Sequence, residues 1–324
     1  MRYLGRTLLR AILLLAGISI LCFLFTEMAP GSFFDELRLN PQVSPETIAN
    51  LRSRYGLDQP LVVRYGRWVK SAARADFGYS IAYNAPVAPL LWGRAKNTLL
   101  LTATGMLLTW LISLPLGVWL AARRGRMLDQ AFSIASSFVV SIPEVVIAVA
   151  LLAIVVRWRL LPLSAGPLHG EGISLRTHVQ DLATRMLVPV TILVFVESAI
   201  IVRHVRASVL EVLGTPFVQA AHSFGICRAR VLFRHVLPAA ASPAISLFGF
   251  SLAGLVSGSL LIEVICGWPG LGPLILEATL SRDLCLVIGG IMLSALFMVG
   301  GNLIADLMLL AADPRIRTGA LDAH

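Results

Sequence analysis

The residues of this sequence that could do chemistry are few, and the foremost are carboxylic acids inside long apolar runs. Glu197 stands near the middle of one run, four residues from both Leu193 and Ile201, and Glu144 directly follows Pro143 in another. An ionisable group at membrane depth is costly and therefore faces either a solute pathway or a partner on a neighbouring helix. A proline inside a span frees a backbone carbonyl and is tolerated beside a cavity or packed neighbours. Glu197, Glu144 and Pro143 are the candidate pathway residues, and both interpretations stay open for them.

Motifs for enzymatic chemistry are missing from the sequence. A phosphate-binding loop needs a Gly-Lys pair, yet neither Lys70 nor Lys96, the only lysines, follows a glycine. The sequence contains no His-Glu-x-x-His pair for a metalloprotease and no Gly-x-Ser-x-Gly elbow for a hydrolase. We therefore expect that the chain is not an enzyme and binds no cofactor itself.

The cysteines do not suggest a metal site, because their spacing fits no ligand set. They are Cys22, Cys227, Cys266 and Cys285. Cys266 and Cys285 could both lie near an outer face, so a bridge and two free buried thiols are both open, and we favour free thiols.

The composition is that of a membrane protein. Of the 324 residues, 57% are hydrophobic and 14% are charged, with a mean hydropathy of +0.80. Soluble domains have roughly 45–50% apolar and about 25% charged residues. The net charge of +9 comes almost wholly from arginines beside apolar runs, and no basic and aromatic cluster suggests nucleic acid.

A polar, arginine-bearing stretch, Thr215 to Pro238, separates two of the apolar runs. Thr215 can cap a helix, Pro216 suits the first helical position, and Gly225 can take the left-handed conformation that ends the helix. Phe217, Ala220, Ala221 and Phe224 recur at helical spacing, which predicts one face of a short helix. The small side chains of Ala220 and Ala221 would leave a surface without protrusions, on which another protein can pack closely.

This stretch resembles a known family. Permease subunits of ATP-binding-cassette (ABC) importers carry Glu-Ala-Ala, three residues, Gly, nine residues and Ile-x-Leu-Pro. Here the same spacing reads Gln219-Ala220-Ala221, Gly225 and His235-Val236-Leu237-Pro238. Gln219 replaces the family's Glu, which puts a salt bridge to an ATPase in doubt, and His235 replaces its Ile. The resemblance implies that this loop couples the permease to its ATPases through Thr215, Pro216, Phe217, Gln219, Ala220, Ala221, Phe224, Gly225, Arg228, Arg230, Leu237 and Pro238.

Further segments resemble the dipeptide/oligopeptide/nickel branch of these permeases. Before the second apolar run stand Met28 to Gly31, Tyr55 to Pro60 and Asp76 to Ser80, although Ser32 occupies a position where Asp is usual. Near the C-terminus, Trp268, Pro269, Gly270 and Gly272 form a glycine-rich turn that we expect to shape the external cap or gate. The resemblance covers essentially the full length of the chain.

The expected fold is an all-α membrane protein with six spans, which the resemblance identifies as a type I ABC importer permease. The apolar runs are Ala11–Met28, Asn97–Leu120, Ala131–Val156, Met186–Val202, Ala239–Ile265 and Leu284–Leu310. We expect an N-terminal segment with the first span at 1–28, an external cap at 29–96, a five-span core at 97–311 containing a cytoplasmic loop at 205–237, and a tail at 312–324.

Arginine placement predicts the orientation. The segments that share one side of a six-span topology hold thirteen arginines: Arg2, Arg6, Arg10, Arg123, Arg124, Arg126, Arg203, Arg206, Arg228, Arg230, Arg234, Arg315 and Arg317. Because short cytoplasmic loops are enriched in basic residues, both termini and the 205–237 loop should be cytoplasmic.

The resemblance implies partners and a mechanism. Expected partners are a second, similar permease with which the chain forms a heterodimer, two ATPases that bind ATP and Mg²⁺, an external substrate-binding protein and the inner-membrane bilayer of a bacterium or archaeon, but no nucleic acid. Transport would follow rigid-body alternating access. The substrate class stays open among dipeptides, oligopeptides, antimicrobial peptides and nickel complexes, as does a homodimeric or heterodimeric permease pair. Alternatives are a secondary transporter, which would need inverted repeats that the sequence does not show, or a non-transporting membrane scaffold or sensor.

Overall fold

The computed structural model describes residues 2–28, 46, 59–159 and 175–312. Several segments singled out above lie wholly or partly outside these ranges. They are the segments at 28–31 and 55–60, part of the external cap at 29–96, and nearly all of the tail at 312–324.

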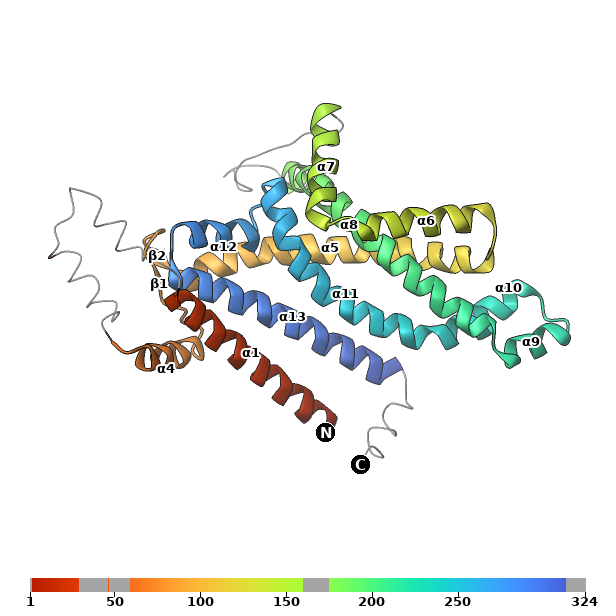
Figure 1. Ribbon diagram of the computed structural model, residues 1–324, viewed down its shortest axis with the longest axis horizontal. Helices are drawn as coiled ribbons and strands as arrows, with labels where there is room; N and C mark the ends of the chain where they lie inside the picture. The colour runs from red at the N-terminus through yellow and green to blue at the C-terminus, as the bar shows by residue number, and fades with distance from the viewer. Residues whose placement is uncertain (1, 29–45, 47–58, 160–174, 313–324) are drawn as a thin grey trace. The chain divides into compact units, whose positions relative to one another are not determined.

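The described residues are almost entirely helical (Figure 1). The long helices are α1 (Arg2–Met28), α5 (Val87–Ala122), α8 (Leu175–Leu213), α11 (Leu237–Cys266) and α13 (Leu284–Ala312). The shorter elements are α4 (Leu61–Ala72), α6 (Met127–Ser141), α7 (Glu144–Arg157), α9 (Pro216–Ser223), α10 (Arg228–Val231), the π-helix η1 (Leu232–Val236) and α12 (Leu271–Leu280). The strands β1 (Tyr79–Ser80) and β2 (Ala85–Pro86) form an antiparallel hairpin.

The lengths and apolar composition of the helices fit an all-α membrane protein, as predicted. Four helices within the described ranges are long and apolar enough to cross a membrane, and counting each of three bent helix pairs as one span raises the number to seven. The six expected spans lie within this range. All four cysteines are free thiols, which confirms the interpretation favoured for Cys266 and Cys285.

The third predicted span is broken more sharply than a proline kink. Helices α6 and α7 meet at a bend of 106°. Ile142 has extended backbone (φ −94°, ψ 134°) and so ends α6. The cause is Pro143, whose ring disfavours the helical conformation in the residue before it.

Helix α8 is longer than the predicted span of residues 186–202 at both ends, because it begins at Leu175 and continues past Arg203 and Arg206 to Leu213. Its approach to α5 is close at Gly117, where a Cβ atom would lie 2.8 Å from Val205 Cγ1 and 3.1 Å from the Val202 carbonyl oxygen. Small residues at such positions let membrane helices pack backbone to backbone.

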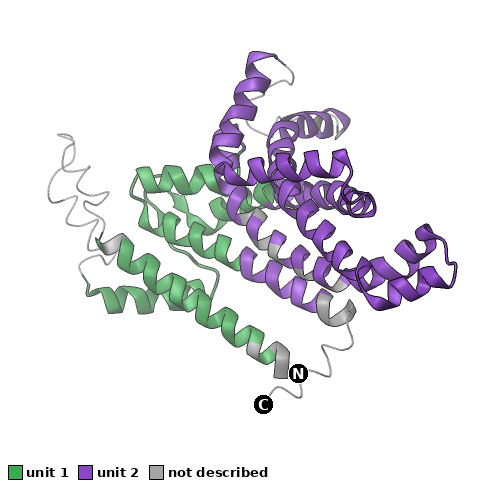
Figure 2. Ribbon diagram, turned by 45° about the vertical axis from the view of Figure 1, so that its right-hand side comes forward, with its two compact units in different colours: residues 1–98, 269–296 green, residues 99–268, 297–324 purple. Residues whose placement is uncertain are grey.

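The chain divides into two compact units (Figure 2). One contains residues 1–98 and 269–296, and the other contains residues 99–268 and 297–324. The predicted boundaries at 28, 96 and 311 are drawn on different grounds, from spans and loops, and stay predictions.

In the first unit, the β1–β2 hairpin is fixed to the α12–α13 turn by Asp283. Its Oδ2 accepts hydrogen bonds from Ser80 Oγ at 2.6 Å and from the Ala82 amide at 3.1 Å. Next to it, Tyr83 donates a hydrogen bond to the Glu277 carboxylate. Burial, helped by that carboxylate, raises the pKa of Tyr83 to about 12, so the phenol keeps its proton. The Asp76–Ser80 motif therefore forms a turn, in which the Gly78 amide donates to Asp76 Oδ1 and Ser80 is bonded to Asp283.

In the second unit, α8 packs against α6, α7 and α11, and its buried side chains enter two apolar clusters. The first cluster includes Leu101, Leu193, Ile262 and Trp268. The second cluster joins the end of α5 to α8, α9, α10, η1 and α11. Its members are Ala121, Ile201, Val205, Val209, Val218, Val231, Val236 and Ala240, and we call it the inner cluster.

Candidate functional site

The stretch from Thr215 to Pro238 begins where α8 ends. Thr215 has the extended backbone of an N-cap residue (φ −75°, ψ 150°), and Pro216 opens α9 as predicted. The predicted side-chain cap is wrong, because the Thr215 hydroxyl donates instead to the Val212 carbonyl oxygen at 2.6 Å. This bond ties the start of α9 back to the last turn of α8.

Helix α9 has one buried side and one exposed side. Val218 is buried in the inner cluster, whereas Phe217, Gln219 and Ala220 are exposed. Phe224, just past the helix end, has 84% of its surface exposed. An aromatic and alanine surface of this kind, fixed from behind by Val218, is suited to contact with another protein.

The two alanines do not share this surface equally, although the sequence predicted them on one face; their contact with another protein stays a prediction. Ala220 is exposed, but Ala221 is half-buried and packs with Ile226 against the inner cluster. Val218 enters the inner cluster, and Ala221, three residues later on the same side of α9, therefore lies against that cluster too.

The end of α9 is a Schellman motif, in which Gly225 takes the left-handed conformation (φ +75°) that the sequence predicted. The Ile226 amide donates to the Ala221 carbonyl oxygen at 3.2 Å, and the Gly225 amide donates to that of His222 at 3.0 Å. These are the two bonds that define the motif. A Cβ on Gly225 would meet no atom within 4 Å, so only the backbone conformation demands glycine there.

The basic residues of the stretch lie on a short second helix that leads into α11. Arg228 and Arg230 of α10 are exposed, while Val231 and Val236 are buried in the inner cluster. The wider π-helical turn of η1 precedes Pro238, which has no amide hydrogen to donate to an α-helical bond. The chain therefore passes into α11 without a break at this proline.

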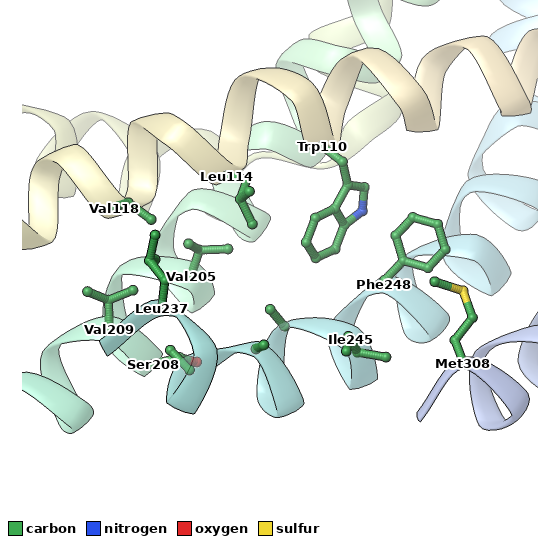
Figure 3. Close-up of a pocket in the computed structure, with 13 residues that line it drawn as sticks. Trp110, Leu114, Val118, Val205, Ser208, Val209, Leu237, Ile245, Phe248 and Met308 are labelled. Carbon is green, nitrogen blue, oxygen red and sulfur yellow. The ribbon is translucent and has the colours of Figure 1, made fainter. Parts of the chain in front are cut away.

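Leu237 lines an apolar cavity of about 310 Å³ in the second unit (Figure 3). At one side of the cavity, Trp110 stacks edge-on with Phe248, with ring centroids 5.4 Å apart, and its Nε1 donates to Ser251 Oγ at 3.0 Å. Val118, Val205 and Val209 lie near Leu237 in Figure 3, and Met308 lies beside Phe248. None of the predicted pathway residues lines this cavity.

The structure brings the three predicted pathway residues together at the break between α6 and α7. Pro143 caps α7, and Glu144 is its first residue. The Glu144 carboxylate lies against α11, since a Cβ on Gly258 would come within 3.0 Å of both its oxygens. Glu197 of α8 is half-buried and close enough to interact electrostatically with Glu144. Their role in a pathway stays a prediction.

The glycine-rich turn is held by hydrogen bonds that the sequence analysis missed. In the first unit, Asn97 Nδ2 donates to the Pro269 carbonyl oxygen at 2.7 Å, and the Leu271 amide donates to Thr98 Oγ1 at 2.8 Å. Gly270 has extended backbone before α12, and Gly272 is buried in its first turn. In the second unit, Trp268 is buried. Asn97 and Thr98 are polar residues at the start of an apolar run, and this pattern in the sequence could have indicated these hydrogen bonds.

A partly buried ion pair, which the sequence did not predict, joins α6 to α8. Arg206 Nε and Nη2 donate to the two carboxylate oxygens of Asp129 at 2.5 and 2.8 Å, and the Gly125 amide donates to Asp129 Oδ2 at 2.9 Å. This bidentate pair fixes the basic loop at 123–126 to the part of α8 that precedes α9.

Comparisons with known proteins agree with this architecture. A sequence model described as "Binding-protein-dependent transport system inner membrane component" matches residues 113–318, and the model of the N-terminal part of such components matches residues 1–102. The chain is 32% identical to the oligopeptide transport system permease protein AppB of Bacillus subtilis strain 168, over 97% of this chain and 98% of that one. It is 31% identical to the dipeptide transport system permease protein DppB of Escherichia coli strain K12, over 93% and 94% of the two chains.

The fold is also similar to that of a solved transporter, the MetNI methionine ABC transporter in inward facing conformations. The TM-score is 0.51 at 18% sequence identity, over 69% of this chain and 96% of that one. This likeness concerns the fold alone. The sequence matches lead to one conclusion: the chain belongs to the family of binding-protein-dependent transport system inner membrane components.

Proposed function

We propose that this chain is the permease subunit of an ATP-driven importer that carries dipeptides or oligopeptides into the cell. The observation that carries the proposal is α9, whose exposed Phe217–Ala220 side is fixed from behind by Val218. Family membership and relatives named as peptide permeases give the substrate class.

Energy would enter through this helix. The complex would contain two separate ATPases that bind ATP and Mg²⁺, and one of them would receive the exposed side of α9 in a surface groove. Because Val218 shares the inner cluster with α5, α8, α10, η1 and α11, a displacement of α9 would move those helices together. A second permease would complete the pathway, and an external binding protein would deliver the peptide.

The decisive experiment is purification of the chain with its genetic neighbours, followed by peptide uptake into liposomes. We expect a stoichiometric ATPase to copurify and the uptake to require ATP, the binding protein and both permeases. A secondary transporter or a scaffold would need no ATPase, and a chain that copurifies without one would contradict the proposal.

In the same assay, Glu197→Gln should change uptake at unchanged assembly if Glu197 lines the pathway.

We also propose that both termini and the 205–237 loop face the cytoplasm of a bacterial or archaeal cell. Asn84 and Ser223 are both exposed in the structure, which makes them a matched pair of probe positions. With all native cysteines replaced, a cysteine at position 84 should react with an impermeant maleimide added outside intact cells, and one at position 223 should react only after lysis. The reverse pattern would overturn the orientation.

A further inference from the structure

Helix α4 separates its side chains by charge. It contains Arg64, Arg67 and Lys70 but no acidic residue, and Arg74 follows its last turn. Arg67, Lys70 and Arg74 are spaced at i, i+3 and i+7 and so share one face. Lys70 and Arg74 are exposed, and Arg67, also exposed, donates to Gln59 Oε1.

The opposite face is fixed to α1. Tyr65 and Trp68 both stack edge-on against Phe23, with ring centroids 5.2 and 5.4 Å apart. The Tyr65 hydroxyl also shares a hydrogen bond of 2.9 Å with Ser19 Oγ. Aromatic residues with a polar atom at their tip are enriched where apolar and polar regions of a membrane meet.

These contacts set the depth of α4 relative to the bilayer. The apolar span of α1 is Thr7–Phe25, and the contact residues Phe23 and Ser19 lie two and six residues before its end. At 1.5 Å of rise per residue, they lie about 3 and 9 Å inside the end of the span. Since α4 lies against this part of α1, it stands at the level where acyl chains give way to headgroups.

Between the fixed face and the basic face, α4 has an apolar strip. Val62, with 77% of its surface exposed, Val69 and Ala73 are spaced at i, i+7 and i+11 and are all exposed, although Val69 and Ala73 also line an apolar pocket beside Ile12, Leu15 and Ala16 of α1. In water the apolar side chains of this strip would stay hydrated, which is unfavourable in free energy. At the bilayer interface, acyl chains would cover it while the basic side chains stay among the headgroups.

We propose that α4 lies in the interfacial layer of the membrane and binds anionic phospholipid there. The Val62–Val69–Ala73 strip contacts the upper acyl chains, and Arg67, Lys70 and Arg74 contact lipid phosphates. The apolar strip and the depth of α4 favour lipid over an acidic protein surface, which would complement the charges but leave the valines exposed. The lipid contact does not depend on what the protein transports.

The test uses the full complex in nanodiscs, with one bimane-labelled cysteine at a time in a cysteine-free chain. Val62→Cys and Lys70→Cys place the label on the apolar strip and on the basic face of the same helix. Doxyl-labelled lipid should quench the label at position 62 several-fold more strongly than the label at position 70, and aqueous iodide should do the reverse. Equal quenching at the two positions would overturn the proposal.

Lipid charge is tested by titrating doxyl-phosphatidylglycerol into phosphatidylcholine nanodiscs and following the label at position 62. Lys70→Gln and Arg74→Gln should each raise the phosphatidylglycerol fraction needed for half-quenching by about fivefold, as expected for a basic residue near a membrane surface. Arg124→Gln, on the exposed loop before α6, is the matched control and should change nothing. An unchanged midpoint in both α4 variants, or shielding of position 62 only when the binding protein is added, would also refute lipid binding.

Discussion

Replacement of Gly225 by valine is expected to leave the complex in the membrane at normal level while substrate-stimulated ATPase activity falls at least tenfold. The backbone at Gly225 is left-handed (φ +75°), a conformation that costs a side-chain-bearing residue about 1–2 kcal/mol. A Cβ at this position meets nothing within 4 Å, so the defect would come from the backbone alone. Valine would change the Schellman bonds to Ala221 and His222 and tilt α9 away from its ATPase groove.

The matched control is Gly225→Asn, because asparagine tolerates the left-handed conformation better than any β-branched residue. We expect this variant to keep most of the stimulation. A second control, Gln219→Glu, restores the charge typical of the family on the exposed side of α9 and should leave coupling intact. Full stimulation in the valine variant, measured in proteoliposomes at matched protein level, would show that the geometry of this turn does not control coupling.

The turn at Gly225 could be predicted from sequence because its cause is local. Glycine is the residue that most readily takes left-handed backbone after a helix, and the structure has that conformation there. The break at Pro143 is local in the same way, since the proline dictates the conformation of Ile142. Its size could not be predicted, because the packing of α6, α7 and α11 against α8 decides the 106° bend.

The orientation of α9 could not be predicted from the sequence. Periodicity grouped Ala220 and Ala221 on one face, but it cannot say which residue packs inward. That depends on Val218 entering a cluster built from α5, α8 and α11. The length of α8 has a similar cause. The predicted span ended at Val202, where the apolar run ends, whereas the helix continues and Arg206 on it pairs with Asp129, 77 positions away.

Arg206→Ala is expected to be far more harmful than Asp129→Ala, although each variant removes the same ion pair. The Asp129 side chain is only 3% exposed, whereas 25% of the Arg206 side chain is exposed. Without Arg206, a buried carboxylate keeps the hydrogen bond from the Gly125 amide but loses its countercharge, and such uncompensated burial costs roughly 3–5 kcal/mol. Without Asp129, the guanidinium can turn its exposed part to water, so we expect a loss of about 1–2 kcal/mol.

Thermal unfolding of the purified complex, monitored by size-exclusion chromatography, measures directly which of the two alanine variants loses more stability. Arg203→Ala is the matched control, because Arg203 is exposed and lies three residues earlier on α8; it should shift stability by less than about 0.5 kcal/mol. The double variant Asp129→Asn with Arg206→Gln should recover part of the stability lost in Arg206→Ala, since it leaves no buried charge. Equal losses from the two alanine variants would mean that water reaches Asp129. In that case the pair would act as a surface contact and could not hold α8 in place for the coupling helix.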